Sequence, residues 1–165
     1  IAAGVALEHD PGLQGRVASA VANCRRRRTP LSLAIVAVDD FDELVFQTGG
    51  LSSRELSKQI ELSLKSLLDR SAEIIVSGDA QFAVLLKDAD RPTAVETSRT
   101  WKQQSGAGLL HWPGEPIELS LSIGVATVSL PAKNFPSDEL IEAAERCLFG
   151  AQASGGSAVK SIDIY

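Results

Sequence analysis

The chain is poor in the residues that build metal and redox centres. It has only two cysteines and two histidines among 165 residues. Cys24 and Cys147 are too far apart in sequence to form a CxxC element, and His9 and His111 are too few for a histidine-rich zinc site. We expect both cysteines to be small hydrophobic residues of the core, the usual situation of a free cysteine.

Long apolar runs and an excess of basic residues are also absent. No run approaches the ~20 apolar residues of a membrane helix, and the sequence shows no signal peptide. The 16 lysines and arginines are outnumbered by 21 aspartates and glutamates, for a net charge of −5. A dedicated nucleic-acid-binding domain normally carries a basic face. We therefore expect no nucleic-acid partner, no direct membrane insertion and a cytoplasmic location in a reducing compartment.

What is present suits one globular domain. Hydrophobic residues make up 44% of the chain and charged residues 22%, which is ordinary globular usage. A chain of this length buries about two thirds of its unfolded surface. Because the sequence has no starting Met, we interpret residues 1–9 as a linker stub from a longer chain and residues 10–165 as the domain. The expected partners are therefore other domains of the same longer chain.

Apolar patterns predict the strands. Residues 31–38 are almost continuously apolar, which is typical of a strand covered on both faces. Residues 117–125 alternate strictly between apolar and polar or small, the strongest strand signal in the chain. Two short apolar runs flank a turn at residues 77–80 and predict a β-hairpin, with Gly78 supplying a positive φ. A short edge strand is expected at residues 159–164.

Helical spacing and end signals predict four helices between these strands. The first starts near Gly15 after a turn at residues 10–12, and the second follows a capping box formed by Ser52 and Glu55. The third covers residues 92–104, and the last starts at a Ser137 N-cap and ends before the glycine pair at 155–156. Helices that alternate with buried strands predict an α/β domain with a central sheet covered by helices.

Four consecutive arginines, residues 25–28, end the first predicted helix. Such a cluster allows two interpretations. It could bind nucleic acid or anionic lipid, or it could be a solvated helix end whose charges complement the carbonyl pole of the helix dipole. The acidic total favours the solvated helix end.

Several segments, in order, resemble the GGDEF domain of bacterial diguanylate cyclases, which condense two GTP molecules into cyclic di-GMP. The resemblance covers residues 10–160 and implies an α+β sandwich-like fold with a mostly antiparallel sheet and a β-hairpin. The matching segments are DPGLQGR at 10–16, LAIVAVDDF at 33–41, GDAQFAVLL at 78–86, LSIGVA at 121–126 and ERCLFGAQASGGSAV at 145–159.

The positions that the family uses for metal have lost most of their carboxylates. Attack of a ribose hydroxyl on an α-phosphate, assisted by a divalent metal, needs hard oxygen ligands. The first metal aspartate of the family falls on Ala37, while the second acidic position is kept as Asp39. The family's signature reads Gly78, Asp79, Ala80, Gln81 and Phe82 here, so both of its acidic letters are uncharged.

The positions that contact the nucleotide are altered as well. The guanine-reading asparagine of the family falls on Val45, the second guanine contact on Arg54, and a lysine after the phenylalanine on Asp42. The two cations that reach the triphosphate fall on Gln152 and Gly156. Each lost charge-assisted phosphate contact costs on the order of 1.5–3 kcal/mol. We therefore expect no catalytic residue, no nucleotide-binding residue, no metal ligand and no cofactor.

Two alternatives remain for ligand sites. If the hairpin slips by one residue, Asp39 and Asp79 could hold Mg²⁺ between the hairpin and the first strand, although Asp39 lies roughly 6–7 Å beyond the usual ligand position. The inhibitory RxxD site of the family falls on Asp69 and Ala72, and an RxxE shifted by one residue runs from Arg70 to Glu73. An arginine and a glutamate there are more often a surface pair.

The sequence therefore favours a catalytically inactive GGDEF-like domain with a structural or regulatory role within a larger signalling protein. A homodimer is a further candidate partner; active family members work as dimers, but an inactive domain has no catalytic need for one. The first alternative is an active diguanylate cyclase or related nucleotide cyclase with rearranged metal ligands. The second is a sensor that binds a nucleotide without turning it over.

Overall fold

A five-stranded sheet forms the centre of the molecule. The computed structural model describes residues 11–49, 52–69, 72–107, 110–111 and 116–164. The strand order is β2-β3-β1-β6-β7, and every neighbouring pair is antiparallel except β6 with β7, which is parallel. These strands are β1 (Leu31–Val38), β2 (Ala72–Gly78), β3 (Gln81–Lys87), β6 (Leu121–Val128) and β7 (Val159–Ile164). The expected mixed fold with a mostly antiparallel sheet is confirmed.

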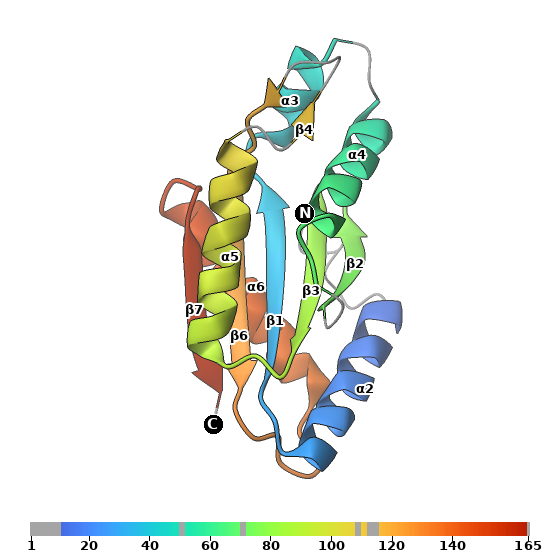
Figure 1. Cartoon of the computed structure of the whole chain (residues 1–165), viewed down its shortest axis with the longest axis vertical. Helices are drawn as coiled ribbons and strands as arrows, with labels where there is room; N and C mark the ends of the chain where they lie inside the picture. The colour runs from blue at the N-terminus through green and yellow to red at the C-terminus, as the bar shows by residue number, and fades with distance from the viewer. Residues whose placement is uncertain (1–10, 50–51, 70–71, 108–109, 112–115, 165) are drawn as a thin grey trace.

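Helices cover both faces of this sheet (Figure 1). They are α2 (Pro11–Arg27), α3 (Phe41–Gln47), α4 (Ser53–Lys65), α5 (Arg91–Gly106) and α6 (Ser137–Ala153). A second, two-stranded sheet pairs β4 (Leu110–His111) with β5 (Pro116–Ile117). Helices α4 and α5 contribute to one core, and α2 and α6 to the other, so the sheet is the middle of three layers.

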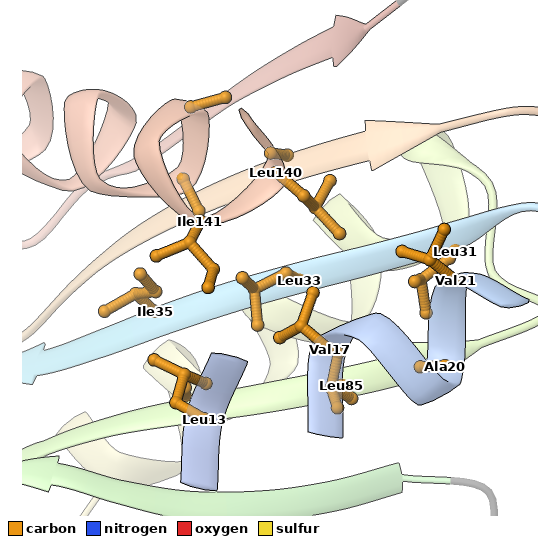
Figure 2. Packing of buried hydrophobic residues seen from close by; sticks show 14 of the residues in the cluster. Leu13, Val17, Ala20, Val21, Leu31, Leu33, Ile35, Leu85, Leu140 and Ile141 are labelled. Carbon is orange, nitrogen blue, oxygen red and sulfur yellow. The ribbon is translucent and has the colours of Figure 1, made fainter. Parts of the chain in front are cut away.

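The central strand explains why the core has two halves. All eight residues of β1 are buried, and successive side chains point to opposite faces. On one face Val36 lies in a cluster with Phe82 of β3 and Ile60 of α4. On the other, Leu33 lies with Val17 of α2 and Leu140 of α6 (Figure 2). The prediction of a strand covered on both faces is therefore confirmed.

Several helix ends differ from the predictions. The first helix, α2, begins at Pro11 rather than near Gly15, because proline suits the first turn, and Leu13 is fully buried there. Ser137 is the first residue of α6 and not its N-cap, which is Pro136. The seven-residue α3, which directly follows the first strand, lacks a clear periodic signal. The Ser52 cap is confirmed, since its side chain accepts the Glu55 N–H.

Two strand predictions need correction. The alternating stretch at 117–125 is not one strand, because β5 ends at Ile117 and β6 starts at Leu121. The small residues of β6 do not face water: a Cβ on Gly124 would meet Leu148 N of α6 at 2.2 Å, so this face packs against a helix. In the hairpin, the positive φ belongs to Ala80, at 53°, and not to Gly78, which lies in β2.

The cysteine prediction holds fully for one residue. Cys24 is completely buried in the core between α2 and the sheet. Cys147 is only half-buried, and burial raises the pKa of its thiol. Both cysteines are free. No helix within the described part of the chain is long and apolar enough to cross a membrane.

Candidate functional site

The residues singled out in the sequence meet at one end of the sheet. The carboxyl end of β1 lies beside the β2–β3 hairpin, with Ala37 paired to Gln81. The Val38 N–H donates to the Ala80 carbonyl at 3.0 Å, which closes this end of the sheet. We call this region the sheet tip; it comprises residues 37–43 and the hairpin turn at 78–81 (Figure 1).

Buried methyl groups occupy two positions where the resemblance calls for acidic side chains. Ala37 is 5% exposed and Ala80 is 2% exposed. Ala80 is held in its left-handed conformation by Ser57 of α4, whose Oγ accepts the Ala80 N–H at 3.0 Å. Gln81 is partly buried, and its Nε2 has no hydrogen-bond partner among the described residues. Phe82 is a fully buried core residue.

The retained Asp39 carboxylate is occupied by three internal donors. Ser120 Oγ donates to Asp39 Oδ2 at 2.6 Å, and Ser122 Oγ donates to Asp39 Oδ1 at 2.6 Å. The Ser157 backbone N–H donates to Asp39 Oδ2 at 2.9 Å. The carboxylate thus joins the end of β1 to the start of β6 and to the turn between α6 and β7. We call this arrangement the Asp39 clasp.

The turn after α6 lies directly against this carboxylate. Gly156 has a φ of +80°, and a Cβ on it would come within 2.9 Å of Asp39 Oδ2. This is the position on which the family's second triphosphate cation falls. The first of the two triphosphate cations falls on Gln152, which is uncharged and exposed on α6. The Asp39 carboxylate therefore fills the space that a side chain at position 156 would need.

Asp79 lies elsewhere, in an exposed position at the hairpin turn. It lines an open depression of about 610 Å³; among the described residues the lining contains four carboxylates and no lysine or arginine, and it consists of Asp40, Phe41, Asp42, Glu43, Ser53 and Asp79. Asp39 instead lines a neighbouring depression of about 200 Å³ together with Glu118. The two candidate metal ligands therefore belong to different depressions.

The donor set at the sheet tip does not fit a resident magnesium ion. Mg²⁺ requires near-octahedral oxygen ligands at 2.0–2.1 Å, usually with one or two free carboxylates. Asp39 already accepts three hydrogen bonds, and Ala37 and Ala80 offer no side-chain oxygen. Within the described residues, no group of three or more histidine, cysteine, aspartate or glutamate side chains is placed to hold a metal.

The positions aligned with guanine contacts offer no base-reading pair. Val45 packs against the core and Arg54 is exposed at the start of α4. Asp42 is exposed in the first turn of α3, where a carboxylate suits the positive pole of the helix. The Arg54 and Asp42 side chains form no hydrogen bond with each other, and the Val45 side chain has no polar atom.

Glu73, the glutamate of the shifted RxxE motif, forms ion pairs with residues outside the motif. Glu73 lies on edge strand β2, 2.6 Å from Arg16 Nη2 of α2 and 3.3 Å from Lys87 Nζ of β3. Burial alone would raise its pKa, but the hydrogen bonds and charges of Arg16 and Lys87 hold the pKa below its usual value of 4.5. Arg70 lies outside the described residues. Glu73 thus forms ion pairs with Arg16 and Lys87, and the expected pair of Arg70 with Glu73 stays a prediction.

Sequence reasoning missed the serines that organise this end of the molecule. Ser57, Ser120, Ser122 and Ser157 each contribute a donor or acceptor to the sheet tip or to the Asp39 clasp. A serine is too common to be informative by itself. The one available signal was the spacing of Ser120 and Ser122, which places both side chains on the same face of an extended chain.

Comparison with known proteins identifies the relatives of this chain. The family model described as diguanylate cyclase, GGDEF domain, matches residues 11–158. The diguanylate cyclase DosC of Shigella sonnei is 28% identical over 142 residues, which cover 85% of this chain and 30% of DosC. The chain therefore spans about a third of the length of that curated relative.

Solved structures agree on the fold. The active GGEEF domain of a diguanylate cyclase from Vibrio cholerae superposes with a TM-score of 0.77 at 18% identity, covering 92% of this chain and 94% of that one. The diguanylate cyclase SiaD of Pseudomonas aeruginosa, solved in complex with its activator SiaC, gives a TM-score of 0.78 at 18% identity. That match covers 92% of this chain and 57% of SiaD.

Proposed function

Because the chain belongs to the GGDEF domain family, we propose that it is a catalytically inactive member with a structural or regulatory role in cyclic di-GMP signalling. It would act as part of a larger protein, since it corresponds to only 30% of the length of DosC. Its partners would be other domains of that protein and a second copy of itself. The relative SiaD offers a precedent for regulation, because it is described in complex with its activator.

The observation that carries this proposal is the Asp39 clasp. In a site that binds metal, a carboxylate keeps its oxygens free for the ion, with the surrounding groups orienting it. Here both oxygens accept hydrogen bonds from protein donors, and the three other acidic positions are the buried Ala37 and Ala80 and the partly buried Gln81. Freeing Asp39 for a metal would leave the hydroxyl of the buried Ser122 without its acceptor, at about 1–3 kcal/mol, whereas Ser120 and Ser157 are exposed and would be hydrated.

Electrostatics at the sheet tip support the same proposal. A nucleoside triphosphate carries several negative charges, and proteins bind it with lysine, arginine, backbone N–H groups and divalent cations. The depression beside the hairpin presents Asp40, Asp42, Glu43 and Asp79, and none of its described lining residues is basic. Like charges of this kind disfavour triphosphate binding, most strongly at low ionic strength.

An assay of the purified chain with GTP and Mg²⁺ or Mn²⁺ tests the proposal directly. We expect no cyclic di-GMP by mass spectrometry and no micromolar GTP binding by isothermal titration. An active diguanylate cyclase under the same conditions is the positive control. Turnover that is lost in both Asp39→Asn and Asp79→Asn would overturn the proposal and establish a cyclase with rearranged ligands.

A thermal-shift screen with guanine and adenine nucleotides separates the structural role from a nucleotide sensor. A ligand present at 100 times its dissociation constant adds about 2.7 kcal/mol to the free energy of unfolding, which is easily visible as a rise in Tm. We expect no rise with any nucleotide. A reproducible rise without turnover would replace the structural role by nucleotide sensing.

A further inference from the structure

The end of the molecule opposite the sheet tip carries four consecutive exposed arginines. Arg25, Arg26 and Arg27 form the last turn of α2, and Arg28 follows with a φ of 57°. Arg27 Nη2 lies 3.0 Å from Asp88 Oδ2. Within the described part of the chain, Arg25, Arg26 and Arg28 form no ion pair. Three cationic groups are thus left for an external partner.

An exposed leucine lies at the same end of the sheet. Leu31, at the start of β1, pairs with Val128, at the end of β6, so the segments beyond both residues leave the sheet along one edge. Figure 1 shows these two connections meeting at the lower end of the molecule. Leu130 is 63% exposed there, and Lys133 of the same connection is exposed as well.

Opposite charges are segregated along the long axis of the molecule. The sheet tip presents four carboxylates, whereas the far end presents the arginines. The net charge of −5 therefore describes neither end. Because salt screens charges beyond about 8 Å at physiological ionic strength, a surface in contact with the arginine end is influenced mainly by that end.

We propose that this end, formed by Arg25, Arg26, Arg28, Leu130 and Lys133 and here called the arginine face, adsorbs to an anionic lipid surface. Clusters of basic residues bind anionic headgroups, and an exposed apolar side chain beside them can enter the interface. The helix dipole accounts for cations at the end of α2 but not for an exposed leucine at the same end of the sheet. That leucine also favours a bilayer over a nucleic acid, whose phosphate surface has no apolar layer.

The proposed docking is peripheral, and it does not depend on whether the domain is catalytically inactive. It places the sheet tip, with its carboxylates, away from the lipid, where repulsion is weakest. Asp88 is paired with Arg27, and Asp90 caps α5. Asp138 and Glu139 follow Lys133 in the first turn of α6, where Asp138 accepts a hydrogen bond from Gln14 Nε2. Arg25, Arg26, Arg28 and Lys133 supply the cationic groups of the surface that would contact the bilayer.

Vesicle co-sedimentation of the 165-residue chain tests this proposal. We expect binding to phosphatidylcholine vesicles that contain about a third phosphatidylglycerol, no binding to pure phosphatidylcholine, and a loss of binding at high salt. A triple variant, Arg25→Gln, Arg26→Gln and Arg28→Gln, should bind roughly 100-fold more weakly, at about fivefold for each arginine. Leu130→Ser should weaken binding severalfold.

A matched control removes three exposed arginines elsewhere, in Arg54→Gln, Arg99→Gln and Arg146→Gln, and should bind as the parent chain does. Equal Tm values would show that both triple variants are folded. The proposal is overturned if the parent chain does not sediment with anionic vesicles, or if the two triple variants lose binding equally. It is also overturned if Leu130→Ser has no effect and a DNA duplex is bound as tightly as the vesicles.

Discussion

At the scale of single residues, the sequence shows which side chains stand at the family's positions, and the structure shows what those side chains contact. Ala37, Ala80 and Gln81 could be assigned because the resemblance, anchored on Phe41 and Phe82, sets their register. The hydrogen bonds to the Asp39 carboxylate could not be predicted, because their donors lie between 81 and 118 positions further along the chain. Hydrogen bonds between such distant segments depend on the complete fold and leave no local pattern.

Among the described glycines, Gly124 has the least space for a side chain. A Cβ there would lie 2.2 Å from Leu148 N and 2.3 Å from Ala144 O, both backbone atoms of α6. Gly124→Ala must therefore displace the helix from the sheet, and we expect a loss of about 3 kcal/mol or more in the free energy of unfolding, measured by urea denaturation.

Gly150→Ala is the matched control for that substitution. Gly150 lies within α6, and its Cβ would meet only Lys160 Cγ at 4.0 Å, which is an ordinary contact. Because alanine favours helix more than glycine, this variant should gain roughly 0.5–1 kcal/mol. If Gly124→Ala were as stable as the parent chain, the close packing of α6 on β6 would be refuted.

At the scale of elements, the strength of each prediction followed the strength of its local signal. Helix α4 was predicted well because Leu56, Ile60 and Leu64 repeat at helical spacing after a capping box, and all three are buried. The alternation of serines and a glycine with apolar residues indicated a strand at β6, and all eight residues of β6 are buried. The sequence does not distinguish small residues that face water from small residues that admit a helix.

Helix α4 also carries a pH-dependent contribution to stability. Glu61, whose side chain is 11% exposed, lies 3.1 Å from Lys65 and 3.5 Å from Lys58. Burial alone would raise its pKa, but the hydrogen bonds and charges of Lys65 and Lys58 hold the pKa below its usual value of 4.5. The contribution is therefore present above pH 4.5 and is lost as the pH falls through the lowered pKa.

Glu61→Gln should consequently be less stable than the parent chain at pH 7, by roughly 0.5–1 kcal/mol because both lysines are largely exposed. The difference should shrink towards zero at pH 3, where the glutamate is protonated in either state. Urea denaturation at the two pH values measures it. Glu96→Gln, at an exposed position of α5, should show little difference at either pH, and an equal loss for Glu61→Gln at both would contradict the ion-pair explanation.

At the scale of the whole molecule, the Asp39 clasp joins segments that lie far apart in the sequence. It links the end of β1 to the start of β6 and to the turn before β7. Strand β7 is the last strand of the sheet and pairs in parallel with β6. Fold class and element order could be predicted because alternating helices and buried strands leave few possible arrangements. The tertiary contact that closes the turn could not.

Asp39→Ala should reduce the free energy of unfolding by roughly 2–3 kcal/mol, since three hydrogen bonds to a charged acceptor are lost and Ser122 is buried. Hydrogen exchange should become faster for amides of the 154–158 turn and of β7. Asp42→Ala, which removes an exposed carboxylate from α3, should cost less than about 1 kcal/mol and leave that exchange unchanged. Unaltered exchange in both variants would show that the clasp does not hold the turn.

The closeness of Gly156 to Asp39 has an evolutionary consequence. A lineage that reacquired an arginine at position 156 would have to fit its Cβ within 2.9 Å of a tethered carboxylate, on a backbone with a φ of +80°. That first step would be harmful unless Asp39 or the turn had already changed. An arginine at position 156 would therefore need an accompanying change at Asp39 or in the turn.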